Sequence, residues 1–346
     1  MIFFSDPQAG LKSIVSIHDS TLGIPVGGTR VHDYASEEQA ILDVLKLAEG
    51  MTQKSAVSGC SSGGAKAIIW ARPADKNELM LRSFGQKVES LKGRFVTGTD
   101  VGITFDDFVV VAQETSHVVA LPEAYGGSGD TATITAYGTW HGIKAAALEV
   151  FGSPRLEGLT VAIQGCGKVG SRLAEHLHNE GCKLLLSDTD PDCVRRLAEK
   201  VGGEVVSPDE ILEAECDILS PNALGGILNS ETIPRLNCRA VAGAANNQLE
   251  KELEDSRRLK ERGILYAPDY VINAGGLIQA FEELGGFVKE RAYARAQGLG
   301  DLLGRIFEIS REKDISTFEA AQALVEERVE QVGRLNRIYL PKRSGL

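Results

Sequence analysis

The sequence predicts an α/β protein of two domains. Its 346 residues are about twice the usual size of a single domain. Along the first 120 residues, short apolar runs alternate with amphipathic helical patterns, which is typical of α/β proteins. From residue 159 the alternation becomes a strict series of βαβ units, which require right-handed crossovers and a parallel sheet. The second domain is therefore expected to be doubly wound.

The first half is predicted to contain three strands and three helices before a hinge. The strands are expected at 13–20, 66–71 and 94–101, and the helices at 36–51, 75–91 and 104–115. Ser36 and Gln39 form a possible capping box. Gly63, Gly64 and Ala65 are interpreted as a strand-end turn that delivers Lys66 to the edge of a strand. The glycine-rich stretch 124–130 is the expected hinge, and a long helix is predicted over 135–152.

The second half continues with strands and helices in strict order. Strands are expected at 159–164, 183–190, 204–207 and 216–221, and helices at 171–181, 191–202 and 208–214. The chain from 292 to 337 is mostly helical, with a break near 313–317. We expect domains at 1–133 and 134–315, with a C-terminal helix of about 316–346 completing the first.

Composition and charge limit the function classes. The formal net charge of −11 argues against nucleic acid or an anionic membrane as partner, because both need a basic surface. The first residues, MIFFSDPQAGLK, are too short in their apolar run for a signal peptide. No apolar run reaches the roughly 18 residues of a membrane span, so a small-molecule partner and a cytoplasmic location are expected.

The cysteines give no sign of a metal site. The six cysteines lack metal-ligand spacing and are expected to be reduced, mostly buried thiols, and they are Cys60, Cys166, Cys182, Cys193, Cys216 and Cys238. Neither a metal nor a cysteine nucleophile is predicted.

A dinucleotide site is indicated where the strand 159–164 runs into GCGKVG and then into a helix. Gly165 would permit the tight turn, Gly167 the approach of a pyrophosphate to backbone N–H groups, and Gly170 close helix packing. Asp188 follows the next strand and is placed to bind the adenosine ribose. Its charge would repel a 2′-phosphate, which favours NAD over NADP. The alternative is a glycine-rich turn without a ligand, and the context of strand, helix and acid favours the cofactor site over it.

Two lysines and an aspartate are candidates for the chemistry. Burial and a second cation would depress the pKa of Lys66, so that it could act as a base near neutral pH. Lys54 is the candidate for that second cation and for holding a substrate carboxylate. Asp100, at another strand end, would be the complementary acid. The alternative is that both lysines are surface residues with exposed ammonium groups, which is the commoner situation for lysine.

Ordered motifs across the chain decide between these alternatives. Together they resemble the leucine/phenylalanine/valine branch of the Glu/Leu/Phe/Val amino-acid dehydrogenases, and the second half looks most like the tryptophan and leucine dehydrogenases. The motifs are GGTR (27–30), MTQK (51–54), GGAK (63–66), TGTDVG (97–102), TAYG (135–138), GCGKVG (165–170), AGAANNQL (242–249) and PDYVINAGGLI (268–278).

The resemblance implies an active-site cleft between the first domain and a Rossmann-type second domain. The reaction it implies is a reversible NAD-dependent oxidative deamination of an L-amino acid to a 2-oxo acid and ammonia. Lys54 would bind the carboxylate, Lys66 would be the base that works with water, and Asp100 would handle the amino proton. Asn273 and the Gly27–Gly28 backbone would position the substrate. The cofactor positions implied are Thr135, for the nicotinamide carboxamide, and Gly165, Gly167, Lys168, Val169, Gly170, Asp188, Ala244, Asn246 and Asn273.

The same resemblance implies that Val26, Gly98, Leu277 and Ala280 line the substrate side chain. None is charged, so a glutamate γ-carboxylate would be left unpaired at a cost of several kcal/mol. Gly98 and Ala280 remove volume relative to branched-chain pockets. We therefore expect an apolar substrate, with aromatic side chains ranked first and branched or long aliphatic ones second.

Two departures from the family pattern leave other functions open. Ala65 stands where the family usually has glycine, so a positive φ there would be strained and could displace Lys66. Residues 131–133, Thr-Ala-Thr, replace Pro-Ser-Pro, which would change the hinge. The alternatives are a biosynthetic relative acting on an unusual amino acid, oxo acid or imine, and an inactive NAD-binding paralogue. A homodimer or a higher homo-oligomer is expected.

Overall fold

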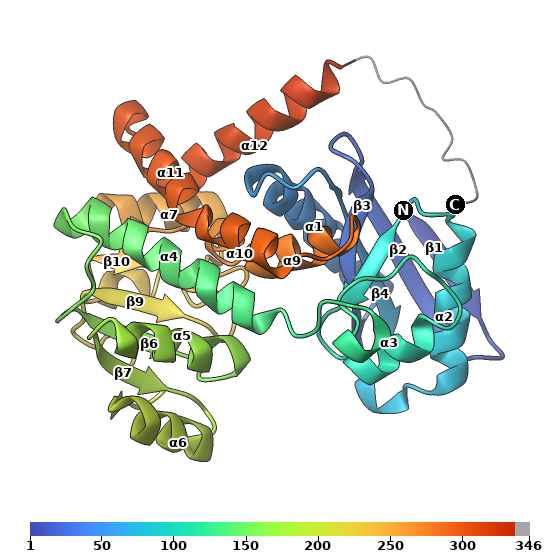
Figure 1. Ribbon diagram of the computed structural model, residues 1–346, viewed down its shortest axis with the longest axis horizontal. Coiled ribbons are helices and arrows are strands. Elements are labelled where there is room, and N and C mark those ends of the chain that lie inside the picture. The colour runs from blue at the N-terminus through green and yellow to red at the C-terminus, as the bar shows by residue number, and fades with distance from the viewer. Residues whose placement is uncertain (336–346) are drawn as a thin grey trace.

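The computed structural model describes residues 1–335 and has two lobes, each built on its own sheet (Figure 1). The remaining part of the expected C-terminal helix, 336–346, lies outside the described residues. The two-domain α/β architecture predicted from the sequence is confirmed. Among the described residues, no helix is long and apolar enough to cross a membrane.

The first lobe contains a five-stranded mixed sheet in the order β1-β2-β4-β3-β5. Helix α1 packs on one face of this sheet, and α2 and α3 pack on the other. The bounds are β1 Ile2–Asp6, β2 Leu11–Asp19, β3 Pro25–His32, α1 Glu37–Val57, β4 Gly63–Trp70, α2 Glu78–Ser90, β5 Val96–Thr99 and α3 Phe105–Val111. Sequence reasoning missed β1, a short edge strand, and β3, whose proline and two glycines disfavour a strand.

Strand β4 corrects two expectations. Gly63, Gly64 and Ala65 lie inside this strand, between β2 and β3, rather than in a turn at its edge. The glycine at 64 is needed for packing, since a Cβ there would stand 2.1 Å from Oγ1 of Thr52 on α1. Ala65 does not have a positive φ, so the expected strain is absent. Alternation along β4 places Ala65 toward α2 and α3, and Lys66 on the opposite face.

The second lobe contains a six-stranded sheet whose strands are all parallel, in the order β11-β10-β9-β6-β7-β8. This order is that of a doubly wound Rossmann sheet, with the reversal between β6 and β9. The bounds are β6 Thr160–Gln164, α5 Lys168–Asn179, β7 Lys183–Ser187, α6 Pro191–Val201, β8 Glu204–Val205, β9 Ile218–Pro221, β10 Ala240–Val241, α7 Glu252–Glu261 and β11 Leu265–Tyr266.

One helix predicted in this lobe is wrong. Residues 208–214 form successive turns, held by contacts such as the backbone bond from Ile211 N to Ser207 O at 3.1 Å. So short a run gains too few helical hydrogen bonds to offset the cost of nucleation.

Helices at the interface connect the two lobes. Helix α4, Ala132–Phe151, begins directly after the expected hinge, and α9, Gly275–Glu283, lies between the lobes (Figure 1). The remaining helices are α8 Asp269–Ile272, α10 Lys289–Gln297, α11 Leu299–Lys313 and α12 Thr317–Gly333. Helix α12 packs against α11 and also against α1 of the first lobe. The predicted break is confirmed at Asp314, whose φ is +53°.

Candidate active site

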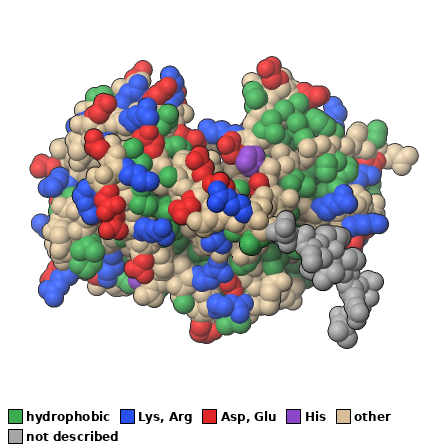
Figure 2. Space-filling view, turned by 90° about the horizontal axis from the view of Figure 1, so that it is seen from above, with side chains coloured by type: hydrophobic (Ala, Val, Ile, Leu, Met, Phe, Trp, Pro, Cys, Tyr) green, Lys and Arg blue, Asp and Glu red, His purple; other side chains and the backbone are tan. Residues whose placement is uncertain are grey.

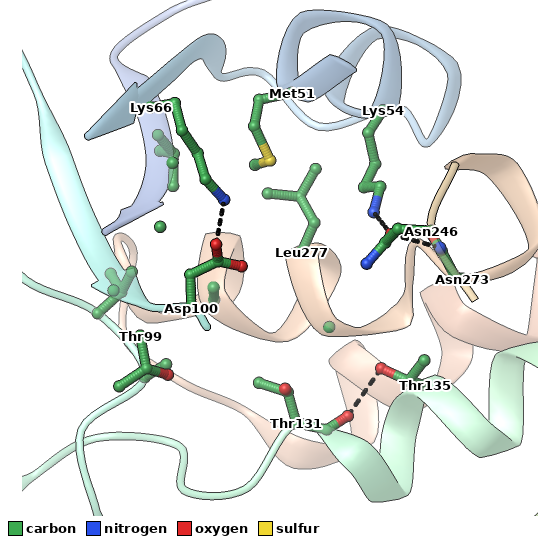
Figure 3. A pocket seen from close by; sticks show the side chains of 18 of the residues that line it. Met51, Lys54, Lys66, Thr99, Asp100, Thr131, Thr135, Asn246, Asn273 and Leu277 are labelled. Carbon is green, nitrogen blue, oxygen red and sulfur yellow. Dashed lines mark hydrogen bonds and ion pairs between the residues drawn. The ribbon is translucent and has the colours of Figure 1, made fainter. Parts of the chain in front are cut away.

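A cavity of about 310 Å³ lies between the lobes and gathers residues from both (Figure 3). Both candidate catalytic residues and all predicted substrate-binding residues line it, together with half of the predicted cofactor positions. The predicted residues found there are Val26, Gly27, Gly28, Lys54, Lys66, Gly98, Asp100, Thr135, Val169, Ala244, Asn246, Asn273, Leu277 and Ala280.

Lys66 and Asp100 form an ion pair at the floor of the cavity. Lys66 Nζ lies 3.2 Å from Asp100 Oδ2, and the lysine side chain is only 7% exposed. Lys66 comes from the middle of β4, and Asp100 follows β5. Gly28 on β3 allows them to meet, because a Cβ at this position would lie 3.0 Å from the Asp100 Cβ and 3.4 Å from Lys66 Nζ.

Arg30 is a third member of this group that sequence reasoning missed. Its Nε lies 3.1 Å from Asp100 Oδ2. Burial alone would raise the pKa of Asp100, but the positive charges of Lys66 and Arg30 outweigh it and leave this pKa below its usual value. Arg30 ends the GGTR motif, two residues after Gly28 on the same face of β3. That spacing is the signal that could have identified it.

Lys54 stands apart from this pair and faces the second lobe. Its Nζ lies 3.3 Å from Asn246 Oδ1, and Asn273 Nδ2 donates to the same oxygen at 2.7 Å. Burial lowers the pKa of Lys54 to about 8, assisted by Lys66 and opposed by Asp269 and Asp100. The Oδ1 atom of Asn273 is buried and has no hydrogen-bond partner among the described residues. An ammonium and an amide oxygen are thus both available to a ligand.

The other end of the cavity is apolar and is smaller than the sequence indicated. A Cβ at Gly98 would lie 3.0 Å from the backbone oxygen of Val119 and 3.4 Å from its Cγ2. Val119 therefore occupies the space that the absent side chain at Gly98 was expected to leave free. Met51, on α1, also lines the cavity beside Leu277 (Figure 3). Sequence reasoning missed both Met51 and Val119.

Glu283, at the end of α9, holds the segment that carries Val119. Its carboxylate accepts hydrogen bonds from Ala120 N at 2.9 Å and from Ser128 N at 3.0 Å. Ala120 has a φ of +60°, a conformation that costs a non-glycine residue of order 1 kcal/mol. The same helix carries Leu277 and Ala280 into the cavity. One carboxylate therefore fixes both apolar walls relative to each other.

The glycine-rich loop of the second lobe has the geometry that a dinucleotide requires. Gly165 has a φ of +94°, and a Cβ at Gly170 would stand 1.9 Å from the Gly165 oxygen. A Cβ at Gly167 would meet nothing within 4 Å, so the backbone here is open to a ligand. Gly167 is also the N-cap residue of α5, and the partial positive charge at a helix N-terminus favours phosphate. The glycines therefore fit the expected cofactor.

The other predicted cofactor residues of this region lie outside the cavity. Asp188 directly follows β7, and its carboxylate accepts hydrogen bonds from Cys166 N at 2.6 Å and from Asp190 N at 3.0 Å. Lys168 lies with its Nζ 5.6 Å from the ring centroid of Phe105 in the first lobe. Acidic and basic side chains are interspersed over the face drawn in Figure 2.

A Rossmann lobe with an open glycine loop, joined to a second lobe that presents two lysines and an aspartate, defines a dinucleotide-dependent oxidoreductase. Comparison with known proteins identifies the family. Residues 1–119 match the "Glu/Leu/Phe/Val dehydrogenase, dimerisation domain" model, and 126–194 and 187–290 match the "Glutamate/Leucine/Phenylalanine/Valine dehydrogenase" model. The chain belongs to this family and is an amino-acid dehydrogenase.

Its relatives differ in their named substrates. The chain is 45% identical to a leucine dehydrogenase of Thermoactinomyces intermedius, over 100% of this chain and 94% of the relative. It is 46% identical to a phenylalanine dehydrogenase of Caldalkalibacillus thermarum, over 99% and 94%. The crystal structure of L-tryptophan dehydrogenase from Nostoc punctiforme is similar with a TM-score of 0.85 at 44% identity, over 96% of each chain.

Proposed function

We propose that this protein catalyses the reversible NAD-dependent oxidative deamination of an apolar L-amino acid to its 2-oxo acid and ammonia. The observation that carries the proposal is the placement of Lys54 and the Lys66–Asp100 pair in one cavity between the lobes. This arrangement offers one site for a carboxylate and another for proton transfer at a neighbouring carbon. The relatives named for leucine, phenylalanine and tryptophan support an apolar substrate.

Each polar residue has a role in this proposal. Lys54 binds the substrate carboxylate, which replaces Asn246 as its partner, and Asn273 contributes its free amide oxygen. Asp100 takes a proton from the amino group. The glycine loop of Gly165, Gly167 and Gly170 would hold NAD, which would supply the acceptor for the hydride that leaves Cα. Lys66 then acts as the base that activates water for attack on the resulting imine carbon, and ammonia leaves.

The apolar end determines the substrate class. Val26, Met51, Val119, Leu277 and Ala280 offer no charge or hydrogen-bonding side chain, so a second carboxylate would be unpaired at a cost of several kcal/mol. Ala280 leaves room for a ring, and we rank aromatic side chains first. Branched-chain side chains are second, and the observation in their favour is Val119, which fills the space beside Gly98.

Two further features belong to the proposal. The half-buried carboxylate of Asp188 beside the glycine loop favours NAD over NADP. A homodimer or a higher homo-oligomer is proposed because the family model that matches the first lobe is named for dimerisation. A cytoplasmic location remains a prediction from the sequence.

The test offers purified protein NAD with each common L-amino acid at alkaline pH and records the reduced-nicotinamide absorbance. We expect reduction with phenylalanine, tyrosine or tryptophan, and its loss in Lys66→Ala. Lys12→Ala, at an exposed position of β2 in the same lobe, is the matched control and should keep full activity. Activity with leucine or valine alone would refute the ranking. Activity that survives Lys66→Ala would refute the assignment of the base.

Silence with all common amino acids, while NAD still binds, would refute the proposed substrate class. It would favour a relative that acts on an unusual amino acid, oxo acid or imine. Because Lys54, Lys66 and Asp100 are gathered in one cavity, an inactive paralogue is the less favoured alternative.

A further inference from the structure

Lys66 and Arg30, the two cations next to Asp100, bind the same oxygen of its carboxylate. Lys66 Nζ lies 3.2 Å and Arg30 Nε 3.1 Å from Oδ2. The described residues place no hydrogen bond on Oδ1. Figure 3 shows this second oxygen turned away from Lys66. The two carboxylate oxygens thus differ, since one is held by the protein and the other is available to a ligand.

Arg30 is itself held from behind by a second carboxylate. Its Nη1 lies 3.0 Å from Asp43 Oδ2 on α1, and the Tyr34 hydroxyl donates to the same oxygen at 2.5 Å. The guanidinium therefore uses Nε for Asp100 and Nη1 for Asp43. A planar group with fixed donors can bridge two carboxylates in this way, whereas a lysine ammonium cannot impose the same geometry.

We propose that Arg30 is a positioning residue for the reaction: with Lys66 it holds Oδ2 of Asp100 so that Oδ1 faces the substrate amino group, and Asp43 controls how strongly it does so. The inference rests on the proposed function. In this proposal, the proton that leaves the substrate amino group goes to Oδ1 of Asp100. Arg30 is not among the described residues that line the cavity, and in this proposal it acts only through Asp100.

The charges around the pair give the inference a direction. Arg30 faces the Lys66–Asp100 pair from β3. Two charged residues of α1 face it as well: Asp43, which lies behind Arg30, and Lys54. Asp269 of the second lobe acts on Lys54, and the lining residues from α9 are Gly276, Leu277 and Ala280. Removing the charge of Arg30 leaves Lys66 as the only cation in contact with Asp100 Oδ2 and makes the electrostatic potential at the pair less positive. Removing the charge of Asp43 has the opposite effect, because Arg30 is then shared with no other carboxylate.

The experiment measures kcat for oxidative deamination against pH, with NAD and the best amino acid, in wild type, Arg30→Gln, Arg30→Lys and Asp43→Asn. The rising limb, which reports deprotonation of the catalytic base in the substrate complex, should move to higher pH in Arg30→Gln and to lower pH in Asp43→Asn. In Arg30→Gln, kcat should fall about 10- to 100-fold, while KM changes less than about threefold because Lys54 is intact. Arg30→Lys should restore the position of the limb but not kcat.

Limbs that move in the same direction in both variants, or do not move, would overturn the inference. So would a parallel loss of kcat and substrate affinity, which indicates a general loss of structure. Circular dichroism and NAD binding check that each variant is folded, and Asp43→Asn tests the inference if Arg30→Gln does not fold. A wild-type protein without activity toward any amino acid would instead refute the proposed function.

Discussion

Lys54 is predicted to reduce the stability of the free protein, and Lys54→Met should therefore be more stable than wild type. The pKa of Lys54 is lowered from 10.5 to about 8, chiefly by burial. At about 1.4 kcal/mol per pKa unit, this shift corresponds to roughly 3 kcal/mol. Partial exposure of the side chain reduces the figure through solvent screening. We expect a gain of about 1 to 2 kcal/mol at neutral pH, since methionine keeps the apolar contacts and removes the charge.

The pH dependence has a defined sign. Because the folded-state pKa of Lys54 lies below the unfolded value, its penalty is fully present below about pH 8 and disappears as pH rises through 10.5. Urea unfolding of wild type and Lys54→Met should therefore differ most near neutral pH and converge toward pH 10.5. Lys46→Met, at an exposed position of the same helix, should change stability by less than about 0.5 kcal/mol.

The reasoning fails if Lys54→Met is less stable than wild type, or if its gain persists unchanged at alkaline pH. Proton-linked stability is the measured quantity, so this test does not depend on the substrate. A more stable variant that has also lost carboxylate binding would identify a site where stability is given up for function.

Three further predictions concern the cavity and the glycine loop. Gly27→Ala should lower the free energy of unfolding by about 3 kcal/mol or more, because its Cβ would lie 1.6 Å from a backbone oxygen of β4; Gly50→Ala, with nothing within 4 Å, is the control in denaturant titration and should be neutral or stabilising. Val119→Ala removes two methyl groups from the cavity wall, each worth about 0.8 kcal/mol of apolar contact. The added space should raise the ratio of kcat/KM for tryptophan to kcat/KM for valine roughly tenfold, and an unchanged ratio would exclude Val119 from the wall that contacts the substrate side chain. Gly167→Ala should leave unfolding unchanged, since its Cβ has free space, yet weaken NAD binding measured by fluorescence; equal affinity would place the pyrophosphate elsewhere.

The sequence predicted the elements that follow periodic patterns, and it failed where long-range packing decides. Strand β6, the glycine loop and α5 follow local rules that one window of sequence contains. Gly63–Ala65 looked like a turn, because a strand that needs glycine to admit a neighbouring helix cannot be distinguished from a loop without knowledge of that helix.

Motif positions predicted the polar residues of the site better than they predicted the size of its apolar end. Lys54, Lys66 and Asp100 were expected in one site and line one cavity. Val119 was missed because it belongs to no motif and reaches the cavity only through the main-chain pairing of Val119 N with Thr97 O at 2.8 Å. Arg30 was within a quoted motif, but its role depends on which face of β3 it shares with Gly28.

The carboxylate of Glu283 has a consequence for how this enzyme could change its substrate. It fastens the segment that bears Val119 to the helix that bears Leu277. The Ser128 hydroxyl also donates to this carboxylate, so a substitution that removes the hydroxyl would shift one wall of the cavity without touching any bound ligand. Laboratory selection for a new side chain should therefore enrich mutations at Glu283 and Ser128 as well as in the cavity itself, and libraries confined to contact positions would miss them.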